Sequence, residues 1–332
     1  MKVEIVTEFG KDISPEQVSQ EYSSDHLSAK SIENITLAVS KAGYDTHVFG
    51  GIPELAETYS KKIEIDKSAV YLNISNGMTQ PSRRMQAPIL CEMLGLNYSG
   101  STPSTVALMN NKYFTKKIVR DLVKTAEDVF IDASVNLDNK IDKIKHYPII
   151  VKPNGEGGSY GIYQENVVFN REDTTKQARK LLNSYSEILL EEMIPGTEIT
   201  NLIIGNRNNY LLNEIVVYKT YGRFEHKNLV RDIKIKTQNI SEALPISAYT
   251  IDDHLIRKIK KTSVSIFERL GCRDIARVDY KINLEGELVF LEINSNPNLY
   301  SKYIDVICKE KNLSYAEFLS LLIKSTCQRY NL

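Results

Sequence analysis

The stretch ARVDYKIN at residues 276–283, followed by LVFLEI at residues 288–293, decides the fold and the chemistry of this chain. Both stretches are apolar and strand-like, and the residues between them, Leu284-Glu285-Gly286-Glu287, are typical of a hairpin turn. We therefore predict two antiparallel strands joined by Glu285-Gly286 as a two-residue loop. The loop length fixes which residues lie opposite each other.

This register places four polar side chains on one face of the hairpin. Arg277 pairs with Asn294 and Asp279 pairs with Glu292, and side chains two residues apart on a strand point to the same face. Opposed carboxylates repel each other unless a cation lies between them. Oxygen ligands beside an arginine suit Mg²⁺ bound together with substrate phosphates. The alternative is a solvated charge ladder, but the apolar run before Glu292 indicates a buried strand.

Length and composition limit the classes of protein to which this chain can belong. A chain of 332 residues can bury a large core and is expected to form two or three domains. Its 42 basic and 42 acidic residues leave no net charge to attract nucleic acid or a membrane surface, so neither is expected as a partner. An acidic substrate must therefore be held by local cations.

The N-terminus and the cysteines predict a cytoplasmic protein. Residues 1–6 begin directly in a strand pattern, which is unlike a signal peptide, and no apolar run approaches the roughly 20 residues of a membrane helix. The cysteines lie singly in apolar settings without metal-ligand spacing, as buried thiols do in a reducing compartment. The histidines form no paired motif, so zinc and histidine-based nucleophilic catalysis are not expected. The cysteines are Cys91, Cys272, Cys308 and Cys327.

The first third of the chain alternates strands and helices, which predicts an α/β fold with a parallel sheet covered on both faces. The second part has strands, glycine-rich turns and two helices, near 174–182 and 252–270, and is typical of an α+β arrangement. Polar stretches at 132–145 and 219–236 are expected to be loops, the second covering the site. The early elements expected are strands at 3–6, 46–49 and 70–74, and helices at 28–42, 84–94 and 112–124.

A glycine-rich loop follows the strand at 149–152. In Lys152-Pro153-Asn154-Gly155-Glu156-Gly157-Gly158-Ser159, backbone amides can close around phosphate oxygens, and the lysine supplies a point charge. The loop is not a Walker A motif, and it returns to a strand, unlike a dinucleotide-binding fingerprint. By itself the loop could also be a flexible hairpin.

The apolar strand at 188–190 ends in Glu191 and Glu192 and is followed by a Pro-Gly turn. Such an edge can offer backbone groups to a purine, and Glu198 could accept hydrogen bonds from ribose hydroxyls. A strand end with solvated glutamates is the alternative for this segment alone.

Taken together, in this order along the chain, these segments resemble the ATP-grasp fold and in particular its D-alanine–D-alanine ligase branch. The stretch from Leu94 to Ser101, the Asn111-Lys112 pair and the Glu292-Ile293-Asn294-Ser295-Asn296-Pro297 motif match that family. The resemblance runs from about Val70 to the C-terminus and more weakly before it. It implies a parallel-sheet domain at 1–111, a central ATP-grasp subdomain at 112–187 and a C-terminal subdomain at 188–332.

The resemblance implies an ATP site. Lys112 and Lys152 would contact the phosphates, Glu191 with the adjacent backbone would contact adenine, Glu198 the ribose, and Lys227 the γ-phosphate. The implied ATP-binding residues are Lys112, Lys152, Gly157, Gly158, Ser159, Glu191, Glu192, Met193, Ile194, Glu198 and Lys227.

The family likeness also implies the cofactors and the reaction. Asp279, Glu292 and Asn294 would hold two Mg²⁺ ions, or Mn²⁺, while Arg277 stabilises an oxyanion with Ser159 and Lys227 as further catalytic residues. ATP would phosphorylate a carboxylate, and an amine would attack the acyl phosphate to give an amide. The substrates implied are small amino acids, carboxylates or amines, and the family suggests a homodimer through the N-terminal domain.

The substrate positions depart from the family pattern. Ser24, with Asp25 beside it, falls where the family has a glutamate for the first substrate, and Gly158 replaces one of two loop serines. Arg83 and Arg84 stand where an acidic pair is usual; they could hold an acidic substrate group or be solvated. The remaining substitutions are Asn76 for a histidine, Asn228 for a tyrosine, Tyr303 for the serine that would hold the second carboxylate, and Asn298 for a glycine.

These departures predict a ligase for substrates other than two D-alanines, because lost polar partners reject the old substrate. Three alternatives stay open: a D-Ala-D-X ligase with another acceptor, an enzyme that loads an amino acid onto a carrier protein, and a non-catalytic ATP-binding regulator.

Overall fold

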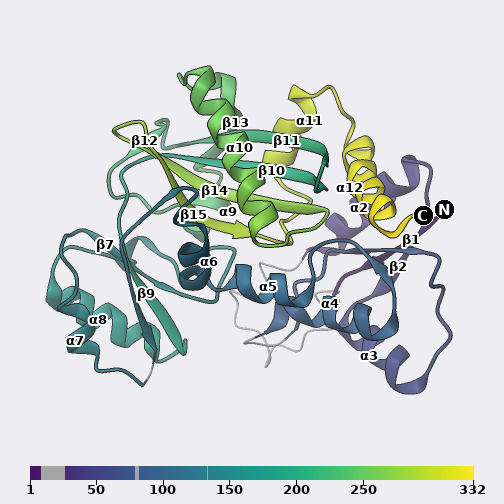
Figure 1. The fold of residues 1–332 in the computed structure, drawn as a ribbon, viewed down its shortest axis with the longest axis horizontal. Coiled ribbons are helices and arrows are strands. Elements are labelled where there is room, and N and C mark those ends of the chain that lie inside the picture. Colours follow the sequence, from purple (N-terminus) through teal and green to yellow (C-terminus); the bar gives the residue numbers. More distant parts are fainter. Residues whose placement is uncertain (9–26, 79–81, 133) are drawn as a thin grey trace.

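The computed structural model of the protein describes residues 1–8, 27–78, 82–132 and 134–332. Three sheets follow one another through the molecule, with the N-terminal sheet and the small sheet under α7 and α8 at opposite ends (Figure 1). The largest sheet lies between them. Among the described residues, no helix is long and apolar enough to cross a membrane.

The N-terminal sheet is parallel, in the order β2-β1-β3-β4, and is covered on both faces as predicted. Helices α2 and α12 pack on one face, and α3 and α4 pack on the other. The Ser28 hydroxyl caps α2, and Gly95 ends α4 in the left-handed conformation. The elements are β1 (Lys2–Val6), α2 (Ala29–Lys41), β2 (Asp45–Gly50), α3 (Ile52–Lys61), β3 (Val70–Asn73), α4 (Arg83–Leu94) and β4 (Asn97–Tyr98).

Two helices lead from this sheet to a small antiparallel sheet in the order β6-β9-β7-β8. Helices α7 and α8 bury one face of that sheet, while the alternate side chains, including Ile150 and Lys152, point to the other face. The elements are α5 (Pro103–Asn110), α6 (Lys112–Val119), β6 (Asp128–Asp132), α7 (Leu137–Ile141), β7 (Ile149–Pro153), η1 (Gln164–Asn166), β8 (Val167–Val168), α8 (Arg171–Leu182) and β9 (Glu187–Glu192).

The largest sheet has the order β13-β11-β10-β14-β15-β5, with β12 paired to β10. Helix α10 covers one face, and α11 and α12 cover part of the other, which leaves the rest of that second face open. The elements are β5 (Lys124–Thr125), β10 (Gly196–Asn206), β11 (Asn209–Thr220), β12 (Glu225–His226), α9 (Ile233–Thr237), β13 (Ser241–Pro245), η2 (Ile246–Ala248), α10 (Asp253–Arg269), β14 (Ile275–Asn283), β15 (Leu288–Asn294), α11 (Lys302–Glu310) and α12 (Tyr315–Tyr330).

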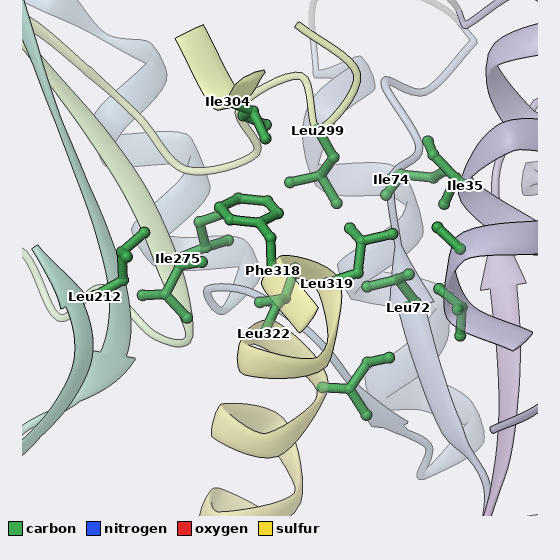
Figure 2. Close-up of a cluster of buried hydrophobic side chains, with 14 of the residues drawn as sticks. Ile35, Leu72, Ile74, Leu212, Ile275, Leu299, Ile304, Phe318, Leu319 and Leu322 are labelled. Carbon is green, nitrogen blue, oxygen red and sulfur yellow. The ribbon is translucent and has the colours of Figure 1, made fainter. Parts of the chain in front are cut away.

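Helix α12 joins the first and largest sheets. Its side chains Phe318, Leu319 and Leu322 meet Leu72 of the N-terminal sheet on one side and Ile275 of the large sheet on the other (Figure 2). A buried phenylalanine in such a place typically contributes about 3–5 kcal/mol relative to alanine. The helix therefore fixes the position of one sheet relative to the other.

A buried carboxylate adds a polar connection at the same junction. Asp274 is fully buried and accepts hydrogen bonds from the Gly100 backbone N–H (2.9 Å), from Asn206 Nδ2 (2.8 Å) and from Arg329 Nη2 (2.6 Å). These partners come from the N-terminal segment, the large sheet and α12. The ion pair therefore holds three parts of the chain that are distant in sequence.

Two sequence-based details were wrong. The hairpin loop has three residues, because Asn283 N–H donates to Glu287 O (2.9 Å) and Gly286 takes a positive φ of 80°. A bulge at Leu291 restores the predicted pairing beyond it, so the polar face is unchanged. The helix expected at 112–124 ends at Val119, since residues 124–125 instead form β5 beside β15.

Candidate active site

The hairpin of β14 and β15 carries four polar side chains on one face. Arg277 lies opposite Asn294, and Asp279 lies opposite Glu292, as predicted. The Asn294 amide nitrogen is 3.3 Å from Asp279 Oδ2 and 3.4 Å from Glu292 Oε1, so the three oxygen-bearing groups converge. Arg277 holds Asp279 with two hydrogen bonds, Nε to Oδ1 (2.9 Å) and Nη2 to Oδ2 (2.7 Å).

Cations balance the second carboxylate as well. Lys112 Nζ lies 3.5 Å from Glu292 Oε2. Burial alone would raise the pKa of Glu292, but the charges of Lys112, Arg277 and Lys152 outweigh it and lower that pKa to about 2. Glu292 is therefore ionised at neutral pH and ready to bind a cation.

The residues present fit a magnesium site shared with a phosphate. Two carboxylates and one amide offer oxygen ligands, and Mg²⁺ usually completes its shell with water and substrate phosphates. Within the described ranges, no cluster of three or more His, Cys, Asp or Glu residues could hold a metal by itself. Asp279, Glu292 and Asn294 would therefore supply part of the coordination shell of Mg²⁺, and phosphate oxygens would supply the rest.

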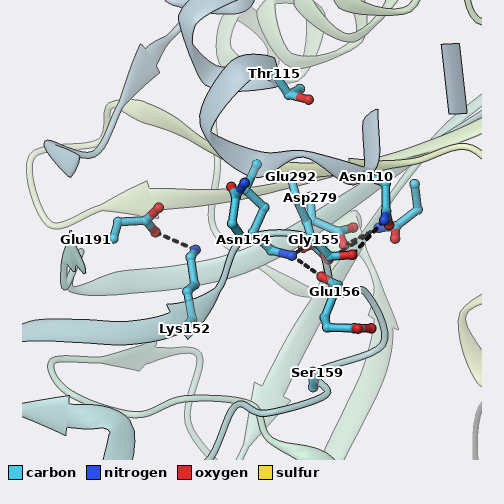
Figure 3. Close-up of polar contacts among 12 residues, drawn as sticks. Asn110, Thr115, Lys152, Asn154, Gly155, Glu156, Ser159, Glu191, Asp279 and Glu292 are labelled. Atoms are coloured by element: carbon cyan, nitrogen blue, oxygen red, sulfur yellow. Dashed lines mark hydrogen bonds and ion pairs between the residues drawn. The ribbon is translucent and has the colours of Figure 1, made fainter. Parts of the chain in front are cut away.

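Lys152 projects from β7 toward β9. Its side chain points toward Glu191 (Figure 3). The Lys152 ammonium is 2.7 Å from Glu191 Oε1, and the other oxygen of Glu191 forms an ion pair with Lys116. Burial and the neighbouring charge of Lys112 lower the pKa of Lys152 to about 7. One buried carboxylate thus lies between two buried lysines at this end of the cavity.

Lys116 belongs to the site although the sequence pattern does not predict it. The residue is buried, and burial with the nearby charge of Lys152 lowers its pKa well below that of a free lysine. Its position on α6 next to the exposed Lys117 looks like an ordinary amphipathic pattern. Only the contact with Glu191, 75 positions further along the chain, makes it part of the site.

The glycine-rich loop lies against α4. A Cβ at Gly157 would come within 2.9 Å of Arg84 Nη2, so a larger residue there would displace the arginine side chain. Gly158 has a φ of 69° and Ser159 a φ of 71°, which turn the loop back toward β8. Gly158 and Ser159 line the cavity, whereas Gly157 lies at its edge beside Arg84.

The segment after β11 closes over this loop. Lys236 donates to Ser159 Oγ, and Ser159 Oγ donates to the Arg231 carbonyl (3.3 Å). Arg231 forms an ion pair with Glu198 and stacks 3.4 Å above the Tyr218 ring. The prediction that residues 219–236 cover the site is therefore in agreement with these contacts.

Two expected residues of this segment lie elsewhere. Lys227 and Asn228 are exposed and do not line the cavity. The reason is the pairing of β12 with β10, where Gly196 lies opposite His226 and directs the chain outward. Of the lysines in this segment, Lys236 is the one that lines the cavity. Desolvation and the charge of Arg231 lower its pKa to about 8.

The edge between β9 and β10 forms one wall of the cavity. Glu192, Met193 and Ile194 line the cavity, and Met193 N–H donates to Pro148 O (3.1 Å). Lys281, which the sequence analysis also missed, donates to Ile194 O (2.8 Å) from a buried position on β14.

The cavity between these elements measures about 140 Å³. Typical small-molecule sites have about 300–1,000 Å³. The contacts of Lys236 and Arg231 with Ser159 and Glu198 occupy the entrance, so a nucleotide-sized ligand needs them to open.

The substrate-side candidates form a separate group next to the glycine loop. Arg83 is buried, donates to Asn76 O (3.0 Å) and lies 3.8 Å from Glu156 Oε2, so it is not solvated. Arg84 lies beside Gly157, Glu292 and Asn294. Asp25 lies outside the described residues.

Tyr303 lies beside Arg277 and is bonded to Asn298. The Tyr303 ring is buried 5.5 Å from the Arg277 guanidinium carbon, and its hydroxyl donates to Asn298 O (2.8 Å). The Asn298 side chain is exposed and caps the backbone of Tyr300. Of the two, only Tyr303 faces the arginine.

The arrangement of a glycine-loop sheet and a carboxylate-bearing sheet around one cavity, after a parallel α/β unit, defines an ATP-grasp ligase. Enzymes of this class use ATP to join a carboxylate to an amine. The chain belongs to the D-alanine–D-alanine ligase family, because residues 118–324 match the family model described as D-ala D-ala ligase C-terminus.

Individual relatives agree with this assignment. The chain is 25% identical over 300 residues to the D-alanine–D-alanine ligase of Aquifex aeolicus, covering 90% of this chain and 94% of that protein. The structure of the Bacillus anthracis D-alanine–D-alanine ligase complexed with ATP matches with a TM-score of 0.73 and 19% identity, covering 99% of this chain and 98% of that one. The VanG D-Ala:D-Ser ligase of Enterococcus faecalis matches with a TM-score of 0.69 and 17% identity, covering 98% and 99%.

Proposed function

We propose that this enzyme forms an amide from an amino-acid-like carboxylate and an amine through an acyl phosphate, and that its substrates are not two D-alanines. The observation that carries the proposal is the convergence of Asp279, Glu292 and Asn294 beside Arg277 and Lys112. A site that only bound a nucleotide would not require this set of cations and metal ligands.

ATP would bind between the two sheets. The backbone of residues 192–194 would face adenine, while Lys112 and Lys152 would hold the phosphates. Glu198 would accept the ribose hydroxyls after releasing Arg231. We assign Glu191 the task of orienting Lys152, since both of its oxygens already face lysines.

Lys236 is our candidate for the γ-phosphate. It lines the cavity and contacts Ser159 of the glycine loop, whereas Lys227, the lysine that the family resemblance suggested, does not line the cavity. When the segment closes on ATP, Lys236 and the Ser159 hydroxyl would lie on the transferred phosphoryl group and exclude water from the acyl phosphate.

The metal-binding residues and Arg277 would act on the developing charge. Mg²⁺, or Mn²⁺, held by Asp279, Glu292 and Asn294 would neutralise the phosphate oxygens during transfer. Metal binding to Asp279 would compete with its two hydrogen bonds from Arg277. The released guanidinium could then stabilise the oxyanion that forms when the amine attacks.

The acceptor pocket supports the substrate part of the proposal. Tyr303 puts a buried ring beside Arg277, where the family resemblance leads one to expect a serine for a second carboxylate. Its hydroxyl is already bonded to the Asn298 carbonyl. We therefore expect an amine acceptor whose carboxylate is absent or differently placed, because a lost polar partner discriminates strongly.

The donor side differs as well. Arg83 is held by Asn76 and Glu156, so Arg84, which lies between Gly157 and the metal-binding strand, is our candidate for an acidic group on the carboxylate substrate. Substitution of Arg84 by alanine should raise KM for that substrate without raising KM for ATP.

ADP release with Mg·ATP against paired pools of L- and D-amino acids and amines, with mass spectrometry of the products, tests the proposal. We expect pool-dependent ADP release and a new amide mass, with D-alanine alone giving little turnover. Efficient D-Ala-D-Ala synthesis would refute the substrate proposal. Turnover only with D-alanine and a second amine would indicate a D-Ala-D-X ligase. ATP binding without ADP release, even with a carrier protein, would indicate a regulator.

Two further proposals follow from the family. We divide the chain into units at 1–111, 112–187 and 188–332, and we expect a homodimer through the N-terminal unit. Analytical ultracentrifugation checks the second, since sedimentation as a monomer at micromolar concentration would exclude a stable dimer.

A further inference from the structure

A second and larger cavity lies outside the active site, bounded by α6, the start of β6 and the turn after α7 (Figure 1 locates α6 and α7). Its volume is about 530 Å³, within the range typical of small-molecule sites. Glu192 lines both cavities, but none of the other residues of the second cavity lines the first.

The lining is rich in cations. It contains five lysine and arginine side chains and three carboxylates, an excess of two positive charges in a chain whose net charge is zero. One histidine is also present. The charged groups are Lys117, Arg120, Lys140, Lys143, Lys145, His146, Glu127, Asp128 and Glu192.

Some of these cations already have partners. Lys117 Nζ lies 2.9 Å from Asp128 Oδ1, and Lys145 lies 3.8 Å from Glu127. Lys140 donates to the Phe130 carbonyl (3.1 Å). Across the described part of the chain, the side chains of two lining residues, Arg120 and Lys143, make no ion pair or hydrogen bond.

The floor of the cavity is aromatic and aliphatic. The Tyr113 and Phe130 rings lie 5.0 Å apart with an interplanar angle of 31°, and Lys117 lies 4.6 Å from the Tyr113 centroid. Val129 and Ile144 complete the apolar surface. A ligand could therefore place an apolar part on the rings and its anionic groups among the cations.

Protection of a sheet edge is the simpler explanation of these lysines. Strand β6 is at the edge of its sheet, and lysines commonly keep such edges from pairing with other chains. This explains Lys140, which is bonded to the β6 backbone. It does not explain Arg120 and Lys143, which surround an open volume rather than the strand backbone.

We propose that this cavity is a binding site for a small, multiply charged anion that carries phosphate or carboxylate groups. Arginine and lysine bind both groups by charge-assisted hydrogen bonds. The site borders the proposed adenine edge, because the Glu192 N–H donates to Glu127 O (2.9 Å) and Glu192 lines both cavities.

Calorimetric titration of the full-length protein at low salt tests the proposal. Inorganic pyrophosphate and citrate serve as the phosphate and carboxylate probes, each in the presence of a saturating non-hydrolysable Mg·ATP analogue that blocks the active site. We expect at least one probe to bind, and the double variant Arg120→Ala/Lys143→Ala to bind it at least tenfold more weakly. The double variant Lys176→Ala/Arg179→Ala removes the same charges from the exposed side of α8 and should bind like the parent.

Several outcomes would overturn the proposal. They are the failure of both probes to bind, an unchanged affinity in the Arg120→Ala/Lys143→Ala variant, and an equal loss in the α8 control, which would mean a non-specific charge effect. Binding of a glutamate-rich peptide without binding of either small anion would replace the proposal by a protein-docking surface. The measurement needs no turnover, so its result is independent of the proposed ligase activity.

Discussion

Binding of Mg·ATP should draw protons from solution at alkaline pH. Lys152 and Lys236 line the cavity with pKa values lowered to about 7 and about 8. Desolvation at the cavity wall disfavours their charged forms while no phosphate is bound there. A bound triphosphate would favour the charged forms and return both pKa values toward that of a free lysine, so binding and protonation are linked.

The size of the effect follows from these pKa values. At pH 8, Lys152 is about nine-tenths deprotonated and Lys236 about half deprotonated in the free enzyme, so ATP binding should take up about 1.4 protons. At pH 6 both lysines are already protonated, and the uptake should fall to about 0.1 proton. Since protons are bound together with ATP, affinity for ATP should decrease as the pH rises from 7 to 9.

Isothermal titration calorimetry in two buffers with different ionisation enthalpies measures this proton uptake directly. The apparent binding enthalpies in the two buffers differ by the number of protons taken up multiplied by the difference between the buffer ionisation enthalpies. The variant Lys236→Met provides the control and should reduce the uptake at pH 8 by about 0.5 proton. An uptake near zero at both pH 6 and pH 8 would refute the placement of these lysines on the phosphates.

Three substitutions test other parts of the account. Asp279→Asn should lower kcat by about 10²-fold or more because a metal ligand is lost, and steady-state turnover within threefold of the parent would exclude that role. Lys236→Ala should raise KM for ATP by about tenfold, the loss expected for one charge-assisted contact. Lys227→Ala should change KM for ATP by less than about twofold. A larger rise in KM for Lys227→Ala than for Lys236→Ala would assign the γ-phosphate to Lys227 instead. Asp274→Ala should lower the free energy of unfolding by about 3–5 kcal/mol, since the Arg329 charge loses its carboxylate partner in a largely buried place. A loss below about 1 kcal/mol in urea denaturation would mean that Asp274 does not hold the three parts of the chain together.

The hairpin shows how local patterning predicts a site. Alternating apolar and polar residues placed Arg277, Asp279, Glu292 and Asn294 on one face, and the structure agrees. The predicted loop was one residue too short, but the bulge at Leu291 compensated, so the facing pairs were right although the turn was not. Such cancelling irregularities leave no clear pattern in the sequence.

Contacts between distant segments account for what the sequence could not predict. Lys116 looks like a surface lysine on α6 until β9 brings Glu191 against it. Lys236 replaced Lys227 in the cavity because β12 pairs with β10, a pairing only two residues long. Arg83 likewise lies near Glu156, which comes from the glycine-rich loop after β7.

The fold class could be predicted almost completely from the sequence. The alternation of strands and helices predicted the parallel N-terminal sheet, because it depends on local period and turn residues. The resemblance to the ATP-grasp family, carried by motifs such as the glycine-rich loop after β7, implied the rest. The surroundings of Arg277 could not be predicted in the same way, because the Tyr303 ring reaches the arginine from a distant part of the chain.

The central claim is that a carboxylate is activated by transfer of the γ-phosphoryl group. The most direct test uses the carboxylate substrate labelled with ¹⁸O in its carboxyl group and follows the label by mass spectrometry during turnover with Mg·ATP and the amine. The account predicts one ¹⁸O atom in the inorganic phosphate released with ADP, since the acyl phosphate breaks at its carbonyl carbon. Release of AMP, or amide formation with unlabelled phosphate, would contradict it.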